Sequence, residues 1–187
     1  MVKRIFDLVM ASLLLCFLSV PILIIGLIVK LTSEGPMLYW SNRVGINNCI
    51  FSMPKFRTMR TGTPDVATHL MKDPEVYLSP IGFFLRNLSL DELPQLYSIL
   101  RGDISFVGPR PALHNQKDLM EMRIEKGIDK IIPGITGWAQ VNGRDNLSVR
   151  EKVEFEDYYL KNRSFIFDSK ILLMTPAKVM RREGVSH

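Results

Sequence analysis

The longest apolar stretch of the chain lies near its N-terminus. Residues 8–29 (LVMASLLLCFLSVPILIIGLIV) carry no charge, and as one helix they would extend ~33 Å, about the thickness of a bilayer core. Pro21 lies in the interior, where a proline removes a backbone hydrogen bond and kinks a helix. The hydroxyl of Ser19 can satisfy a backbone group that this break frees. The pattern predicts a helix broken at Ser19 and Pro21.

Both flanks of this stretch are basic, with Lys3 and Arg4 before it and Lys30 after it. The positive-inside rule therefore gives no orientation, as expected if both ends stay on the cytoplasmic side of a membrane. A bent helix that enters and leaves the same leaflet fits these features, and a kinked spanning anchor is the alternative. A secretory signal peptide is excluded, because the run is too long and no small-residue cleavage site follows it.

The polar and apolar pattern changes after residue 35. The segments 38–44 and 50–53 flank the turn 45–48 and predict a short β-hairpin. Helical spacing follows over residues 80–88, from about 89 to 101, and over 113–126 with Leu113, Leu119, Met122 and Ile124 as its candidate buried positions. Two further helices are predicted, one from the capping box Ser148-x-x-Glu151 to about residue 162 and one over 165–182. The predicted fold is a compact, mainly helical α+β domain.

The last of these helices is amphipathic and ends in basic residues, Lys178, Arg181 and Arg182. One interpretation places it at the level of lipid headgroups beside the N-terminal segment. The other is a helix packed on the core with a solvated basic end.

Composition narrows the classes of partner. The net charge of +5 in 187 residues is too diffuse for a dedicated nucleic-acid binder, but it suits a phosphate-rich ligand or an anionic membrane surface. Cys16 and Cys49 are unlikely disulfide partners, which agrees with a reducing compartment. The zinc patterns CxxC and HExxH are absent from the sequence, and so are the GxGxxG and GxxxxGK[ST] nucleotide motifs.

Two adjacent carboxylates, Asp91 and Glu92, stand ahead of Pro94. Proline is tolerated in the first turn of a helix, so the helix is predicted to begin near residues 89–91 with both carboxylates at its N-terminus. The helix dipole favours the ionised form there, and an ionised aspartate beside a metal-binding partner is able to attack phosphorus. The alternative is structural, since Ser89-x-x-Glu92 fits a capping box and Asp91 is a good N-cap.

Several cationic and amide side chains are candidates for the same site. Arg86 precedes Asp91 by five residues, and Arg110 is held between two prolines, which presents one guanidinium rigidly to a phosphate. An ordinary turn is the alternative for that Pro-Arg-Pro segment. The shaped loop 133–145 carries side chains that suit a nucleobase or a sugar: Trp138, Gln140, Asn142 and Arg144. Packing is the commoner explanation of an isolated tryptophan.

These segments together resemble the small monotopic phosphoglycosyl transferases of the bacterial sugar transferase family, nearly from end to end. The resemblance rests on the apolar run with Pro21 and on the later segments 55–59 (KFRTM), 86–95 (RNLSLDELPQ), 102–111 (GDISFVGPRP) and 133–144 (PGITGWAQVNGR), with Tyr158, Tyr159 and Asp168 following. One departure is Val20 before Pro21, where many members have serine.

The resemblance implies an activity and a location. A phosphosugar would pass from a UDP-sugar, with an N-acetylated amino sugar expected, to polyprenyl phosphate, releasing UMP. Residues 1–34 would be a re-entrant membrane helix, and residues 35–187 a catalytic domain with interfacial amphipathic helices on the cytoplasmic face of the bacterial inner membrane. The partners would then be the UDP-sugar, the polyprenyl phosphate and the phospholipid membrane, with no nucleic acid.

The resemblance also implies roles for the candidate residues. Asp91 would be the nucleophile that forms a covalent phosphosugar–aspartyl intermediate, and Glu92 would assist it. Mg²⁺ would be the cofactor, held by Asp91 and Glu92. The substrate-binding side chains would be Lys55, Arg86, Arg110, Arg144 and Gln140. Asp157 and Asp168 are either structural or turned toward the nucleotide.

Two other classes of protein remain as alternatives. A non-enzymatic, membrane-anchored assembly factor would need neither the carboxylate pair nor the rigid arginine. A basic nucleic-acid-binding domain would bind with a steep dependence on salt, and it would leave the apolar N-terminal segment unexplained.

Overall fold

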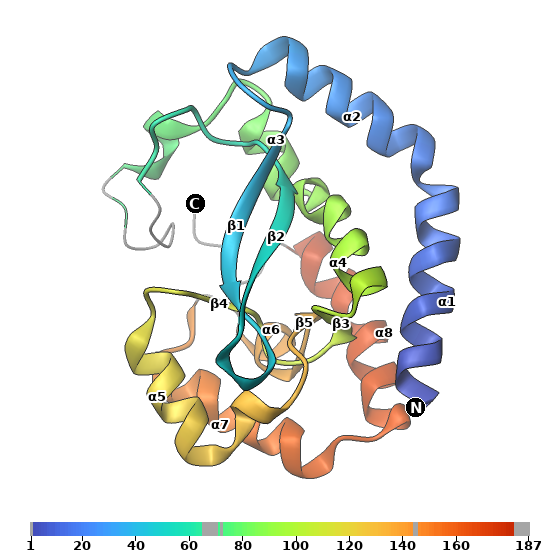
Figure 1. Cartoon of the computed structure of the whole chain (residues 1–187), viewed down its shortest axis with the longest axis vertical. Helices are drawn as coiled ribbons and strands as arrows, with labels where there is room; N and C mark the ends of the chain where they lie inside the picture. The colour runs from blue at the N-terminus through green and yellow to red at the C-terminus, as the bar shows by residue number, and fades with distance from the viewer. Residues whose placement is uncertain (1, 65–70, 72, 144–145, 182–187) are drawn as a thin grey trace.

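The computed structural model of the chain describes residues 2–64, 71, 73–143 and 146–181 (Figure 1). A bent pair of helices, α1 (Val2–Phe17) and α2 (Ser19–Thr32), runs along one side of the molecule and over its end. The chain bends by 63° between the two helices. The break lies just before Ser19 rather than at Pro21, because a proline ring displaces the carbonyl four residues earlier, which here belongs to Phe17. The hydroxyl of Ser19 donates to the Cys16 carbonyl at 2.8 Å, as expected for a freed backbone group.

By length and composition neither helix alone is apolar and long enough to cross a membrane, whereas the bent pair taken together passes such a test. The pair packs on the rest of the molecule through buried positions such as Ala11 and Val29. Its outward positions are large, apolar and exposed: Ile5, Val9, Leu13, Phe17, Val20, Leu23, Ile24, Leu27 and Leu31. This exposed apolar surface distinguishes the pair from the helices of an ordinary core.

The predicted hairpin is confirmed. Strands β1 (Leu38–Val44) and β2 (Ile50–Phe56) pair antiparallel, joined through a short 3-10 turn η1 (Ile46–Asn48). The second strand is three residues longer than predicted, and it includes Pro54. A proline is tolerated there because β2 is an edge strand in the order β2-β1-β4, where β4 is Ala112–Leu113. A second, parallel pair, β3 (Ser105–Val107) with β5 (Gly134–Thr136), was not predicted.

Helices make up most of the remaining described structure, so the mainly helical α+β prediction is confirmed. They are η3 (Pro74–Tyr77), α3 (Gly82–Asn87), η4 (Leu90–Gln95), α4 (Leu96–Arg101), α5 (Lys117–Lys126), η5 (Ile128–Lys130), α6 (Trp138–Asn142), α7 (Val149–Asn162) and α8 (Phe165–Arg181). The predicted capping box opens α7, with Ser148 and Glu151 bonded reciprocally.

The prediction for α5 was wrong in two respects. The helix begins at Lys117 rather than at 113, because Leu113 pairs with β1 in strand β4. Leu119 is buried as predicted, but Ile124 is 51% exposed.

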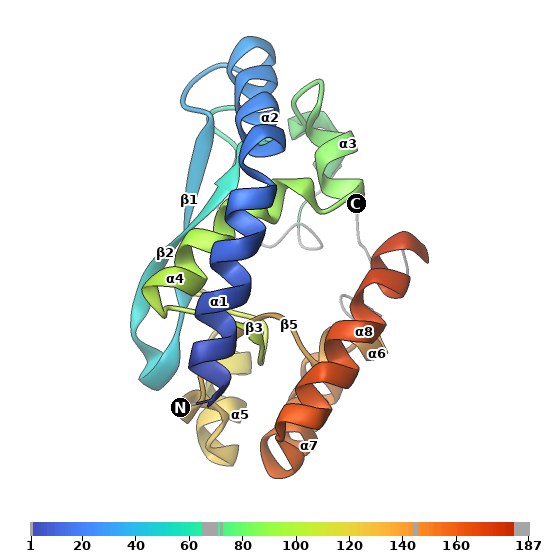
Figure 2. The same ribbon diagram turned by 90° about the vertical axis from the view of Figure 1, so that its right-hand side faces the viewer.

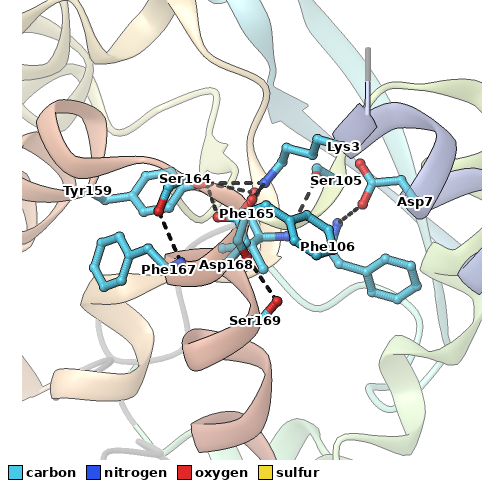
Figure 3. Close-up of polar contacts among 11 residues, drawn as sticks. Lys3, Asp7, Ser105, Phe106, Tyr159, Ser164, Phe165, Phe167, Asp168 and Ser169 are labelled. Carbon is cyan, nitrogen blue, oxygen red and sulfur yellow. Dashed lines mark hydrogen bonds and ion pairs between the residues drawn. The ribbon is translucent and has the colours of Figure 1, made fainter.

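Polar residues at the start of α1 tie this helix to distant elements such as β3, α4 and α8. Lys3 pairs with Asp168 of α8, and Asp7 accepts a hydrogen bond from the backbone N–H of Phe106 in β3 at 3.2 Å (Figure 3). Arg4 donates to the carbonyls of Ile99 and Leu100 at the end of α4, at 2.5 and 2.8 Å. Figure 2 shows α1 running along α4, with α8 to its side. The N-terminal helix is therefore part of the framework that positions α4 and α8.

Candidate active site

Asp91 and Glu92 lie in η4, which packs against β2 and leads directly into α4. The segment begins as a tight 3-10 helix rather than as the predicted α-helix. Ser89 before it has a left-handed backbone (φ 54°), and its side chain makes no capping hydrogen bond. A side-chain N-cap requires extended backbone angles, so the interpretation of Ser89 and Glu92 as a capping box is wrong. Asp91 is not the N-cap either, because it lies inside η4, which begins at Leu90.

Two cations converge on Glu92. The ammonium Nζ of Lys55, from strand β2, lies 2.9 Å from Oε1 of Glu92. A guanidinium nitrogen of Arg110, from the loop between β3 and β4, lies 3.1 Å from the same oxygen. The structure therefore brings together two side chains that were predicted as phosphate contacts, from positions 55 residues apart in the chain.

The environment of Asp91 shifts its pKa. Burial, which leaves Asp91 only 7% exposed, raises the pKa of its carboxyl above the ordinary value. Lys55 opposes this shift, the neighbouring charge of Glu92 reinforces it, and Arg86 and Arg110 oppose it further. Burial also lowers the pKa of the Lys55 ammonium, against the attraction of Glu92 and Asp91. A buried carboxylate with an elevated pKa is more nucleophilic when ionised than a solvated one, which is typical of functional sites.

A buried ion pair holds the backbone of Arg110 in place. Arg123 of α5 and Glu156 of α7 form two hydrogen bonds, at 2.8 and 2.5 Å, and both side chains are buried. Arg123 also donates to the backbone carbonyl of Arg110 at 2.9 Å. The flanking prolines at 109 and 111 restrict the same backbone. Sequence reasoning missed this support, because no local pattern connects residues 33 positions apart.

A pocket of about 180 Å³ opens beside Glu92 and Arg110. Its wall combines aliphatic and polar side chains from η4 and the residue before it, and from α4, β5, α6 and α8: Ser89, Leu93, Leu96, Ile135, Thr136, Gln140, Val141, Thr175 and Lys178. The predicted Gln140 is part of this wall, and both polar atoms of its amide are buried without a hydrogen-bond partner among the described residues. Such a group is costly unless something else satisfies it. Thr175 and Lys178 were not predicted as site residues.

The remaining candidates divide clearly. Arg86, on α3, is close enough to Asp91 to lower the pKa of its carboxyl. Arg144 lies outside the described residues, so its prediction stays open. Trp138 packs against Phe167 and Tyr158, with ring centroids 4.9 and 6.1 Å away, which confirms the packing alternative for this tryptophan.

Two further candidate carboxylates lie outside the wall of this pocket. Asp157 pairs with Lys126 and Lys161 at 3.1 and 2.8 Å. Asp168 accepts from the hydroxyl of Tyr159 at 2.7 Å and pairs with Lys3 (Figure 3). Each of these two carboxylates is thus occupied by partners in the framework.

The carboxylates of the site are compatible with one kind of metal binding. Among the described residues no three His, Cys, Asp or Glu side chains are grouped closely enough to enclose a metal ion. Mg²⁺ does not require such a cage, because it keeps several waters and binds through one or two carboxylates together with substrate phosphates. Asp91 and Glu92 therefore fit a Mg²⁺ that is shared with a phosphate ligand.

Sequence comparison identifies the family. Residues 1–182 match the profile of the bacterial sugar transferases. The chain belongs to the bacterial sugar transferase family. The resemblance inferred from the motifs is thus confirmed, and with it the expectation of an enzyme, a transferase.

Three relatives illustrate the range of the family. The sugar transferase EpsL of Bacillus subtilis (strain 168), itself named as uncharacterized, is 44% identical over 98% of this chain and 89% of its own length. The UDP-glucose:undecaprenyl-phosphate glucose-1-phosphate transferase of Escherichia coli (strain K12) is 40% identical over 95% of the chain. The UDP-N-acetylgalactosamine-undecaprenyl-phosphate N-acetylgalactosaminephosphotransferase of Aeromonas hydrophila is 34% identical over 98% of it. The chain spans only 40% and 44% of the length of the last two.

Proposed function

We propose that the protein transfers a sugar 1-phosphate from a UDP-sugar to polyprenyl phosphate and releases UMP. The observation that carries this proposal is the buried Asp91 carboxylate, next to Glu92 and among Lys55, Arg86 and Arg110 at the edge of a pocket. Such a group of cations suits a diphosphate, and a partly desolvated carboxylate among them suits attack on phosphorus. The names of relatives such as the E. coli enzyme support the same pair of substrates.

The first step is a displacement at the β-phosphorus of the UDP-sugar. A carboxylate oxygen of Asp91 forms a bond to this phosphorus, and the bond from the phosphorus to the oxygen that bridges the two phosphates breaks. The bridging oxygen leaves with the electron pair as part of UMP. The product on the enzyme is a mixed anhydride between Asp91 and the sugar phosphate, and no proton has to be transferred to balance the step.

The second step regenerates the enzyme. A phosphate oxygen of polyprenyl phosphate attacks the same phosphorus, and the bond between this phosphorus and the Asp91 oxygen breaks. Asp91 returns to a carboxylate, and the product is polyprenyl diphosphate sugar. UMP leaves before the acceptor reacts, so ping-pong kinetics are expected.

The surrounding charges assist both steps. Lys55 and Arg110 share the Glu92 carboxylate, which holds both cations beside Asp91 before substrate arrives. Pre-positioned cations stabilise the charge that develops on the transferred phosphoryl group and on the leaving UMP without further reorganisation. Asp91 and Glu92 would hold Mg²⁺ in part, and the bound ion would neutralise the diphosphate.

We expect the sugar to be an N-acetylated amino sugar. Relatives are named for glucose, for galactose and for N-acetylgalactosamine, so the donors to compare are the UDP derivatives of all three sugars and of N-acetylglucosamine. Gln140 is the amide in the pocket wall that would contact the donor.

The bent pair α1–α2 is proposed as a re-entrant helix in the cytoplasmic leaflet of the bacterial inner membrane. Its exposed apolar positions and its basic flanks support this placement. The catalytic residues would then face the cytoplasm, where one substrate is soluble and the other is anchored by its tail.

The test is a reconstituted transfer reaction. The purified full chain is incubated in lipid nanodiscs with polyprenyl phosphate, Mg²⁺ and each UDP-sugar, and released UMP and the extracted lipid product are quantified. The proposal expects stoichiometric UMP and polyprenyl diphosphate sugar with at least one donor. Sugar transfer with release of UDP instead of UMP would contradict it.

A further inference from the structure

The end of α8 reaches the pocket. Thr175 and Lys178 belong to its wall, together with Glu92 and Arg110. The amphipathic pattern predicted a headgroup-facing or solvated basic end for this helix. Of the three basic residues at that end, the structure describes the side chain of Lys178, which is half-buried at the pocket that contains the candidate phosphate-binding side chains.

Two contacts fix α8 in this position. At its start, Asp168 is held by Lys3 and by the hydroxyl of Tyr159 (Figure 3). Further along, the hydroxyl of Thr175 lies 2.8 Å from that of Thr136 in β5. Thr175 donates its own proton to the Ile171 carbonyl, so the proton between the two threonines comes from Thr136.

The contact with β5 also determines where Lys178 lies. Residues three apart on a helix share one face, so Lys178 follows Thr175 on the side of α8 that faces the pocket. Packing of α8 against β5 therefore places the backbone of Lys178 beside the pocket.

Cations from separate elements gather around this pocket. Arg110 and Lys178 belong to its wall together with Glu92, and Lys55 pairs with the same Glu92 carboxylate. Arg86 lies close enough to Asp91 to act on its charge. Several cations at one site attract an anionic ligand such as a phosphate.

We infer that Lys178 is a substrate-binding residue that contacts a phosphate of the donor or of the lipid acceptor, with Arg110 contributing to the same pocket. The inference deepens the proposed function and rests on it. It assigns the phosphate-binding charge to two separate parts of the fold, the β-hairpin and its neighbouring loops on one hand and the C-terminal helix on the other.

The test measures binding of UMP to the full chain in nanodiscs by calorimetry. Lys178→Met removes the charge and keeps most of the aliphatic stem, and Lys178→Arg keeps the charge. Lys170→Met is the matched control, because Lys170 lies on the same helix over the ring of Trp138, outside the pocket wall. Uridine, which has no phosphate, serves as the matched ligand.

Loss of one charge-assisted contact is expected to weaken UMP binding by on the order of ten- to a hundredfold in Lys178→Met. Lys178→Arg should recover most of this loss, and Lys170→Met should bind UMP as the wild type does. Affinity for uridine should be the same in all variants. This result identifies the donor phosphate as the group that Lys178 contacts.

A second measurement separates donor from acceptor. If Lys178→Met leaves UMP binding unchanged but raises the KM for polyprenyl phosphate, and Lys170→Met does not, Lys178 contacts the acceptor phosphate. The inference is overturned if neither quantity changes, if Lys170→Met has the same effect, or if Lys178→Met only releases the protein from nanodiscs with anionic lipid.

Two controls keep these results interpretable. The thermal unfolding midpoint of each variant reports on folding, and Lys178→Gln provides a second neutral side chain if methionine disturbs the wall. A wild-type protein that neither binds UMP nor turns over any UDP-sugar would reject the proposed function itself. A wild-type protein that binds UMP and turns over a donor, with both the UMP affinity and the KM for polyprenyl phosphate unaltered in the neutral Lys178 variants, would reject only the role of Lys178.

Discussion

The ammonium of Lys55 and the carboxylate of Glu92 are 2.9 Å apart, directly beside the buried Asp91. The same Glu92 oxygen accepts from Arg110 at 3.1 Å. Glu92 therefore keeps two cations next to the nucleophile before a polyanionic substrate arrives. In this position their charges favour the ionised form of Asp91 against the effect of burial.

This arrangement predicts the pH dependence of UMP release. Asp91 must be ionised to attack, and burial raises its pKa above the ordinary 3.8. Activity should therefore fall as the pH is lowered through this raised pKa, so that the acid limb of the profile lies above pH 3.8. Lys55→Met removes a charge that lowers the pKa of Asp91, and the acid limb should move to higher pH. Pre-steady-state UMP release measured across pH tests both points.

Glu92→Gln provides the opposite change. The charge of Glu92 raises the pKa of Asp91, so its removal should move the acid limb to lower pH. Reduced rates with an unmoved acid limb in both variants would mean that the limb belongs to a group other than Asp91.

The buried pair of Arg123 and Glu156 should control both stability and the placement of Arg110. Glu156→Gln leaves the Arg123 charge buried without its partner, which typically costs about 3–5 kcal/mol of unfolding free energy. The KM for the donor should rise as well, because Arg123 also donates to the Arg110 carbonyl. Denaturant unfolding and steady-state kinetics measure the two effects.

The control is Glu154→Gln on the same helix, whose partner Arg150 is exposed. An exposed pair contributes ~0–1 kcal/mol, so this variant should resemble the wild type. Equal losses in the two variants would show that the buried pair has no special role.

Gln140→Leu should separate binding from stability. The amide of Gln140 has no hydrogen-bond partner among the described residues, so its removal should leave the unfolding free energy within about 0.5 kcal/mol of the wild type or raise it. The KM for the UDP-sugar should rise about tenfold, as expected for one lost hydrogen-bonding group. Asn142, although a candidate by sequence, lies outside the pocket wall, and its exposed side chain donates to the Trp138 carbonyl of its own helix; Asn142→Ala is therefore the control for both quantities. A large loss of stability without a change in KM would assign Gln140 to packing.

Asp168 should stabilise the junction of α1 and α8. Asp168 accepts a hydrogen bond from the hydroxyl of Tyr159 and pairs with Lys3. An asparagine in its place turns an amide N–H group toward one of these two donors, which then lacks an acceptor. Asp168→Asn should therefore lower the unfolding free energy by about 1–3 kcal/mol and speed proteolysis between the two helices. Asp157→Asn, which alters contacts with the exposed Lys161, should have a smaller effect. The prediction fails if the two variants are equally stable.

The features that the sequence predicted correctly are mostly local. The hairpin, the Ser148 capping box, the end of α4 at Arg101 and the break near Pro21 each follow from residues within a few positions of one another. The carboxylate pair at 91 and 92 was recognised in the same way. Local backbone chemistry determines each of these features, so tertiary packing did not change them.

The features that the sequence did not predict depend on contacts between distant segments. The pair of Arg123 and Glu156 joins two helices, and Lys178 and Glu92 reach one pocket wall from α8 and η4. The left-handed backbone of Ser89 is incompatible with the capping box that the sequence spacing predicted. Packing of η4 against β2, rather than local propensity, determines the geometry at Asp91.

The most direct test of the account is the intact mass of the protein after incubation with Mg²⁺ and each UDP-sugar, without lipid acceptor. Covalent catalysis by Asp91 predicts a mass gain of one sugar phosphate on the wild type with the correct donor, its absence in Asp91→Asn, and its loss when polyprenyl phosphate is added. UMP release that requires polyprenyl phosphate, with no adduct for a donor that is turned over, would contradict covalent catalysis by Asp91 and indicate direct transfer between the bound substrates.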